Sequence, residues 1–309
     1  MSGMMNKFYY GNAGKADYTP DQLPANRLSL FLEMFKLRFG GLCLMSLVIT
    51  LVGLPAILWS WATFQVVLMD VENAAANSAP LSVVLLPRLT TYCLILIPCL
   101  IFYTFFMPGV MYILRNWARD QHTFTVSDFK DAVLANWKQS LLLGLVNGLT
   151  ILLGYVGYVV YGTMAENGGA FFYIPQMLII LILCIWWMAN MLIIPMMVTY
   201  DMDFRTLIKN ALIMTLSRLP WSLLFWGGSI AIPALVALFV PYGVAIVGSL
   251  YALSLLGITH FVYASYANSC FDRFLNPRIK GAKVGMGLRD PAHGEEDDVT
   301  VTDEDIKNL

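Results

Sequence analysis

Residues 39–69 read FGGLCLMSLVITLVGLPAILWSWATFQVVLM, a stretch of 31 residues without Asp, Glu, Lys or Arg. A helix needs about 20 predominantly apolar residues to cross the hydrocarbon core of a bilayer, so this stretch is long enough to span a membrane. Four more uncharged stretches follow at 89–114, 139–165, 167–200 and 219–271. The last one has room for two spans, and the turn between them is expected at Pro241-Tyr242-Gly243, because Pro lacks a donor and Gly tolerates a positive φ.

These stretches predict an all-α fold, a polytopic bundle of six transmembrane helices with short amphipathic helices on the cytoplasmic side. The expected membrane domain covers residues 27–271, with spans at about 41–66, 89–114, 140–165, 174–199, 220–240 and 244–268. Residues 1–26 are expected to form a flexible cytoplasmic lead. Residues 272–309 are expected to form a disordered cytoplasmic tail that is first basic and then acidic.

Composition and charge agree with this architecture. The chain is 58% hydrophobic and only 13% charged, which is too apolar for a soluble domain. Six spans would place eighteen of the nineteen Lys and Arg residues on one side of the membrane, with Arg88 as the exception. Because an excess of Lys and Arg in short loops marks the cytoplasmic side, we expect both termini in the cytoplasm.

An amphipathic pattern precedes three of the spans. Apolar residues recur at helical spacing opposite charged ones in helices that begin near residues 28, 128 and 206. Each of these segments is followed by a pair of spans, so the chain divides into three units of similar design. Either an internal repeat or a shared amphipathic requirement explains this pattern.

A polar stretch between the second and third spans carries a family resemblance. The sequences PGVMYILRNWAR at 108–119, DFKDA at 128–132 and NWKQS at 136–140 together resemble the signature of the YesL family of bacterial membrane proteins. The residues that carry the resemblance are Pro108, Tyr112, Arg115, Asp128, Phe129, Asn136 and Lys138. It implies a protein of the bacterial cytoplasmic membrane that has no established activity and works beside carbohydrate-uptake systems and sensor kinases.

Motifs of known enzymes are absent from the sequence. It contains no GxGxxG, Walker, GxSxG or HExxH motif, and its three histidines, His122, His260 and His293, fall in a loop, a span and the tail. We therefore expect no catalytic residue, cofactor or metal. We also expect no nucleic-acid partner, since orientation in the membrane and anionic lipid account for the basic residues.

The spans contain neutral polar residues but no carboxylate. All twenty Asp and Glu residues fall outside the spans, which argues against an ion-coupled carrier with an ionisable group at the membrane midplane. Asn147, Gln176, Asn190 and His260 each have a plain explanation as interhelical hydrogen-bonding residues. A sharper hypothesis joins Trp186, Asn190 and His260, with Asn147, in a polar pocket whose aromatic faces suit a sugar ring.

Three functions follow from these observations. The favoured one is an accessory or regulatory component that works with a transporter or sensor kinase through cytoplasmic or membrane contacts, since nearly all polar residues lie on one side. A facilitator or carrier for a small neutral solute and a lipid-handling or membrane-organising protein are the alternatives. The lipid bilayer is the expected partner in each case, and the sequence leaves the oligomeric state open.

Overall fold

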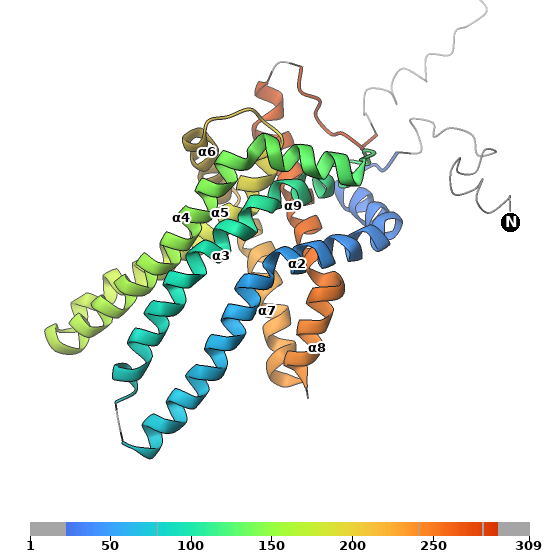
Figure 1. Cartoon of the computed structure of the whole chain (residues 1–309). Coiled ribbons are helices and arrows are strands. Elements are labelled where there is room, and N and C mark those ends of the chain that lie inside the picture. The colour runs from blue at the N-terminus through green and yellow to red at the C-terminus, as the bar shows by residue number, and fades with distance from the viewer. Residues whose placement is uncertain (1–22, 79, 241, 280, 290–309) are drawn as a thin grey trace, which may run out of the picture.

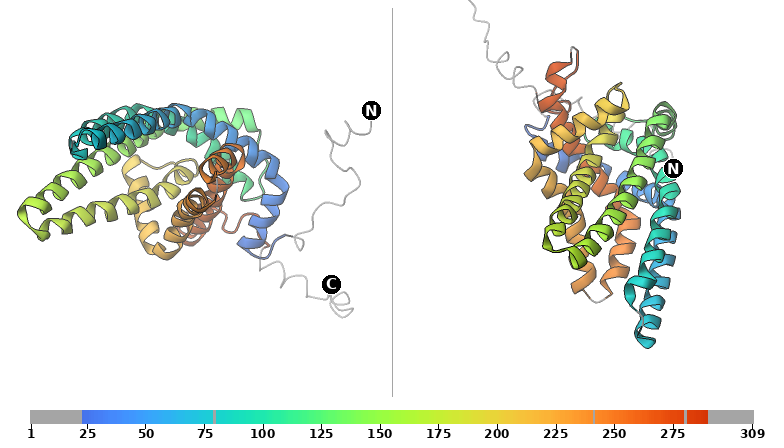
Figure 2. Two further views of the ribbon diagram at one scale, coloured as in Figure 1. Left: turned by 90° about the horizontal axis from the view of Figure 1, so that it is seen from below. Right: turned by 90° about the vertical axis from the view of Figure 1, so that its left-hand side faces the viewer.

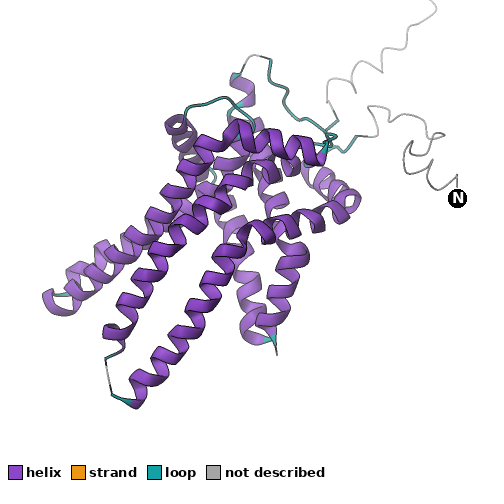
Figure 3. Cartoon of the chain, viewed as in Figure 1, coloured by secondary structure: helices purple, strands orange, loops and turns teal. Residues whose placement is uncertain are grey.

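The computed structural model describes residues 23–289 except 79, 241 and 280, and every regular element in this part is a helix (Figure 3). The expected acidic tail, with His293, and nearly all of the expected lead lie outside the described residues. The main helices are α2 (Arg27–Ala76), α3 (Leu81–Trp117), α4 (Thr125–Gly168), α5 (Tyr173–Met197), α6 (Phe204–Ser217), α7 (Leu219–Phe239), α8 (Gly243–Leu250) and α9 (Leu256–Phe274). Short elements are η2 (Ala170–Phe172), η3 (Tyr251–Leu255) and η4 (Asn276–Arg278).

Six helical segments of the described chain are long and apolar enough to cross a membrane. They are Arg27–Ala76, Leu81–Trp117, Thr125–Gly168, Ala170–Met197, Leu219–Phe239 and Gly243–Arg278. The expected all-helical, multi-pass architecture is confirmed at this level. Each expected span lies within or close to one of these segments, although several segments extend well beyond the span because flanking polar residues are helical as well.

The six segments form three hairpins, α2–α3, α4–α5 and α7–α8, that meet at one end and diverge toward their tips (Figures 1 and 2). We call the meeting place the convergent end: there the last turns of α3, α5 and α9 lie with α6 and the first part of α2. Helices α3 and α4 make the most extensive contact between hairpins, and α9 packs against α2. The first two hairpins are therefore joined along most of α3 and α4, out to the hydrogen bond from the hydroxyl of Tyr155 to the carbonyl of Leu86 (3.1 Å), whereas α7–α8 meets them near the convergent end.

The amphipathic segments do not all form separate helices. The first two are continuous with the spans that follow them, in α2 and α4, and only α6 is a helix of its own. Helix α2 has 50 residues, which at 1.5 Å per residue gives about 75 Å, far more than a hydrocarbon core of about 30 Å. The chain breaks at Arg218 because Pro220 fits only the first turn of the next helix, where no donor is missed.

The turn between α7 and α8 falls where the sequence predicts it, but its residues act differently. The positive φ belongs to Tyr242, at 59°, and not to Gly243. Gly243 is required for space instead, because a Cβ there would lie 2.1 Å from the carbonyl oxygen of Val236. The expectation of a positive φ at Gly243 is thus wrong, while close approach of the two helices accounts for that glycine.

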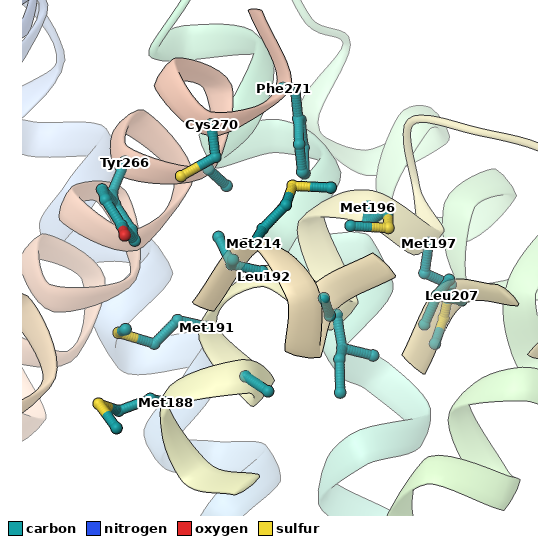
Figure 4. Close-up of a cluster of buried hydrophobic side chains, with 14 of the residues drawn as sticks. Met188, Met191, Leu192, Met196, Met197, Leu207, Met214, Tyr266, Cys270 and Phe271 are labelled. Atoms are coloured by element: carbon teal, nitrogen blue, oxygen red, sulfur yellow. The ribbon is translucent and has the colours of Figure 1, made fainter. Parts of the chain in front are cut away.

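Buried apolar side chains concentrate at the convergent end. One cluster joins α5, α6 and α9, and it is rich in methionine: Met188, Met191, Met196, Met197 and Met214 belong to it. Figure 4 shows these side chains between the ribbons, with Tyr266, Cys270 and Phe271 of α9 beside them. A second cluster joins α2, α3 and α9. Because unbranched methionine fills irregular gaps, it suits a site where several helices meet at different angles.

A π-helical segment, Tyr251–Leu255, joins α8 to α9 where this pair crosses α2. Such a segment interrupts the regular ladder of helical hydrogen bonds, and side chains of α2 form hydrogen bonds with backbone groups in and next to it. Ser46 accepts a hydrogen bond from the backbone N–H of Gly257 (2.7 Å) and donates to the carbonyl of Tyr251 (3.4 Å). Thr50 donates to the carbonyl of Ala252 (3.4 Å). The crossing is therefore a polar contact between side chains of α2 and the backbone of η3 and α9.

Candidate functional site

A cavity of about 190 Å³ lies between α3, α4, α5, α7 and α9. Three of the four predicted pocket residues, Asn147, Asn190 and His260, line it. Trp186 does not; its neighbour Trp187 does, together with Trp226. The structure thus brings the predicted polar residues to one place from three different helices, with a different tryptophan on the wall.

The two amides of this cavity and Trp186 bond to one another. Nδ2 of Asn147 donates to Oδ1 of Asn190 (3.0 Å), and Nε1 of Trp186 donates to Oδ1 of Asn147 (2.9 Å). Nδ2 of Asn190 in turn donates to the carbonyl of Trp186, one turn earlier in α5 (3.0 Å). This chain of bonds ties α4 to α5, which is the interhelical role expected of buried amides in a membrane.

His260 faces the amide pair from α9. Its Nδ1 lies 2.8 Å from the carbonyl oxygen of Leu256, and because a carbonyl only accepts, this nitrogen carries the proton. In the neutral ring, Nε2 is then the acceptor for the hydroxyl of Tyr103, 3.4 Å away. Both ring nitrogens have partners, so the imidazole fits its site as a neutral group.

The size and lining of the cavity limit its chemistry. Its volume lies below the roughly 300–1,000 Å³ of typical sites for drug-sized ligands, and none of the described residues that line it is charged. Amide, hydroxyl, indole and imidazole groups suit water or a small neutral solute. Among the residues that the structure describes, none in the lining carries a carboxylate for proton exchange.

The residues of the family resemblance lie where α3 meets α4. Gly109, next to Pro108, allows the Phe129 ring to pack on α3, since a Cβ on Gly109 would lie 2.6 Å from that ring. Asp128, in the first turn of α4, accepts a hydrogen bond from the N–H of Phe124 (2.8 Å), the residue that precedes the helix. Further residues of this set make local contacts: Asn136 donates to Ala132, Lys138 lies over the Trp137 ring, and Arg115 lies over the Tyr112 ring.

Two arginines hold the last turns of three helices together at the convergent end. Nη1 of Arg115 donates to the carbonyl of Val198 (3.1 Å) after α5, and Nε of Arg119 donates to Oδ1 of Asn268 (2.9 Å) in α9. Arg119 is only 8% exposed, and burial lowers the pKa of its guanidinium. Asn268 also donates to the carbonyl of Arg115 (3.3 Å). Sequence reasoning missed Asn268, although an amide in the last uncharged stretch was a signal available to it.

The described residues of 275–289 lie over this end and tie it to the start of α2. Asp272 pairs with Arg27 and accepts from the N–H of Gly285 (3.1 Å). The hydroxyl of Tyr200 donates to Oδ1 of Asn276 (2.5 Å), and burial raises the pKa of Tyr200 to about 12. The backbone of Arg289 bonds to that of Pro24 (3.1 Å), so the two ends of the described chain meet.

Arg88, the exception in the charge pattern, forms an ion pair with Asp70 (2.9 Å) near the tip of the α2–α3 hairpin.

Comparisons of the chain with protein-family models, with curated proteins and with solved structures found no match.

Proposed function

We propose that the protein is an accessory or regulatory component of a membrane system and offers its divergent hairpins to partner proteins. The observation that carries this proposal is the exposure of α7 and α8. Ser222 is the buried residue of the 21-residue helix α7, and Gly243 that of α8. The hairpin holds to the rest mainly through its ends, so its apolar sides are available to lipid or to helices of another protein.

The arrangement of polar groups supports this role over transport. The amides of Asn147 and Asn190 bond to each other and to Trp186, and both nitrogens of His260 have partners. Each of these groups already has a partner within the bundle, whereas a site built for a solute holds its polar groups toward the solute. They support a bundle held together by its own polar contacts.

The proposed setting is the bacterial cytoplasmic membrane, with both termini and the convergent end in the cytoplasm. The segregation of Lys and Arg supports this orientation. Tags fused at Met1 and Leu309 should resist membrane-impermeant reagents added to intact cells and react after permeabilisation. Labelling of either tag in intact cells would overturn the orientation.

The proposed partners are a carbohydrate transporter or a sensor kinase, and this part rests on the family resemblance. A photo-crosslinking residue at Leu238, which is 77% exposed on α7, tests it directly. The same residue at Leu207, which is fully buried in the core, is the matched control. We expect an adduct with one membrane protein of an uptake or signalling system at Leu238 and none at Leu207, and deletion of the gene should slow growth on the corresponding carbon source.

The rival function is a facilitator for a small neutral solute, and the 190 Å³ cavity favours it. Vesicles that contain this protein alone decide between the two. Solute uptake down its gradient, abolished when Asn190 and His260 are both replaced by Ala, would establish the facilitator and refute the accessory role. Tight vesicles together with the Leu238 adduct support the accessory role.

A further inference from the structure

A second concave site lies at the convergent end, separate from the polar cavity. It is a groove of about 450 Å³ between the first turns of α2, the start of α7 and the face of α9. Its volume is within the roughly 300–1,000 Å³ of typical ligand sites. Residues of α2, α7 and α9 all line it, and Trp221 in its lining is 52% exposed, so the groove opens on the surface of the bundle.

One end of the groove is cationic. Arg27 and Arg218 line it, and within residues 23–289 as described no Asp or Glu does. Arg27 is paired with Asp272, but Arg218 has only neutral partners among the described residues: Ser269 Oγ at 3.0 Å and Cys270 Sγ at 3.7 Å. One positive charge of the groove thus lacks a counter-charge in the part of the chain that the structure describes.

The position of the Arg218 side chain is fixed by its surroundings. Its guanidinium lies over the ring of Tyr266, 5.4 Å from the ring centre, and the hydroxyl of Tyr266 is bonded to that of Ser222 (2.8 Å). A guanidinium that is held in place loses little conformational freedom when it binds an anion, and its planar donors match the oxygens of a phosphate.

The rest of the groove is apolar. Phe31, Phe225 and Val262 line it. Trp221 also lines it and is 52% exposed, and its ring is stacked on that of Phe225 with 6.3 Å between the ring centres. Arg218 immediately precedes the apolar helix that begins at Leu219. The cationic end therefore lies at the border of a span, where lipid phosphates lie, and the apolar part is suited to an acyl chain.

We propose that this groove binds an anionic glycerophospholipid, with its phosphate at Arg218 and Arg27 and one acyl chain along Phe31, Phe225 and Val262. A soluble anion would match the arginines but leave the apolar walls uncovered, whereas a neutral lipid would leave Arg218 without a counter-charge. The inference does not depend on the accessory role, since it concerns the bilayer itself.

The test uses the delipidated full-length protein in detergent and follows bound lipid by native mass spectrometry. With equimolar phosphatidylglycerol and phosphatidylcholine, the wild-type protein should retain phosphatidylglycerol preferentially. Arg218→Gln should weaken its binding about fivefold, the effect of roughly one basic residue at an anionic lipid surface. Arg273→Gln is the matched control, because Arg273 is an exposed cation of α9, which also lines the groove, but Arg273 itself lies outside the groove.

A second variant tests the shape of the groove independently of its positive charge. Ser265→Phe places a ring in the groove without changing the charge, and Ser265 makes no side-chain hydrogen bond that its loss would break. It should also weaken lipid binding while the circular dichroism spectrum stays unchanged. Phosphatidylglycerol with brominated chains should quench part of the tryptophan fluorescence, and Trp221→Phe should remove that part.

Three results would overturn the proposal. Equal retention of phosphatidylcholine, whose phosphate is offset by the choline cation, would show that a net negative headgroup is not recognised. An equal loss in Arg218→Gln and Arg273→Gln would show a diffuse surface effect. Competition by inorganic phosphate as strong as that by the lipid would show a small-anion site without a role for the apolar walls.

Discussion

Replacing Gly257 by Ala should destabilise the protein by forcing α9 away from α2. A Cβ at this position would lie 2.1 Å from the carbonyl oxygen of Leu42 and 3.1 Å from the backbone nitrogen of Ser46. Since carbon and oxygen atoms approach to roughly 3.3 Å at closest, the helices would have to part by roughly 1.2 Å. Backbone atoms stand on both sides of this contact, so no side chain can rotate to relieve it.

The cost has two parts. Overpacking of a tight contact costs about 1–3 kcal/mol. The same shift would stretch the hydrogen bond from Gly257 N to Ser46 Oγ, now 2.7 Å, beyond bonding distance, and a polar contact between membrane helices averages about 0.6 kcal/mol. A gain of about 0.5–1 kcal/mol from replacing Gly by Ala within a helix offsets part of this loss. We expect a net loss of about 2 kcal/mol.

The assay is unfolding of the purified protein by sodium dodecyl sulfate in mixed micelles, followed by circular dichroism. Gly228→Ala is the matched control, because Gly228 is also helical and a Cβ there meets nothing within 4 Å. Ser46→Ala keeps the packing and removes only the hydrogen bonds, so it should cost less than Gly257→Ala. If Gly257→Ala proved as stable as Gly228→Ala, the close crossing of α2 and α9 would be refuted.

Three further predictions concern other contacts. Asn147→Leu and Asn190→Leu should each destabilise the protein by about 1 kcal/mol, and the double variant should cost less than the sum, because the two amides bond to each other; strict additivity in the same unfolding assay would contradict the bond. Asp272→Asn removes the partner of Arg27 and weakens the anchor of the following segment, so trypsin should cut after Lys283 faster than in the wild type; an unchanged cleavage rate would show that this anchor does not hold the segment. The side chain of Asp203 accepts a hydrogen bond from the hydroxyl of Thr206 at the start of α6, and this bond lowers the pKa of the Asp203 carboxyl group. The bond stabilises the fold fully above the unfolded pKa of about 3.9, and this stabilisation is lost as the pH falls through the lower pKa of the folded state. The thermal midpoint of the wild type should therefore fall more between pH 5 and pH 2 than that of Asp203→Asn, and parallel curves would exclude this role.

The sequence predicts the number of spans and the place of the last turn, because charge and apolar length determine both. It does not predict that the amphipathic segment and the span of α2 form one helix, because Gly40 and Gly41 lie between them and glycine weakens a helix. At α6 the break follows from Pro220, a local signal. The positive φ of Tyr242 had no such signal, because tyrosine rarely adopts that conformation.

The sequence predicts most of the residues of the candidate site but not their arrangement. Asn147, Asn190 and His260 were identified because polar groups stand out in an apolar span, and they line one cavity. Helical periodicity was too coarse to choose between Trp186 and Trp187 as the wall residue. The contact of Arg119 with Asn268 could not be predicted, since it joins residues 149 positions apart and depends on how three helices end together.

The packing of α9 against α2 has a consequence for biogenesis. The contact between Ser46 and Gly257 spans 211 residues of chain, which a ribosome needs on the order of ten to forty seconds to translate. The first two hairpins therefore enter the bilayer long before α9 exists, and Arg27 waits for Asp272 until the last span has been made. A nascent chain that stalls before this point exposes an unclosed, cationic end, which a membrane protease could use to distinguish an unfinished molecule from a complete one.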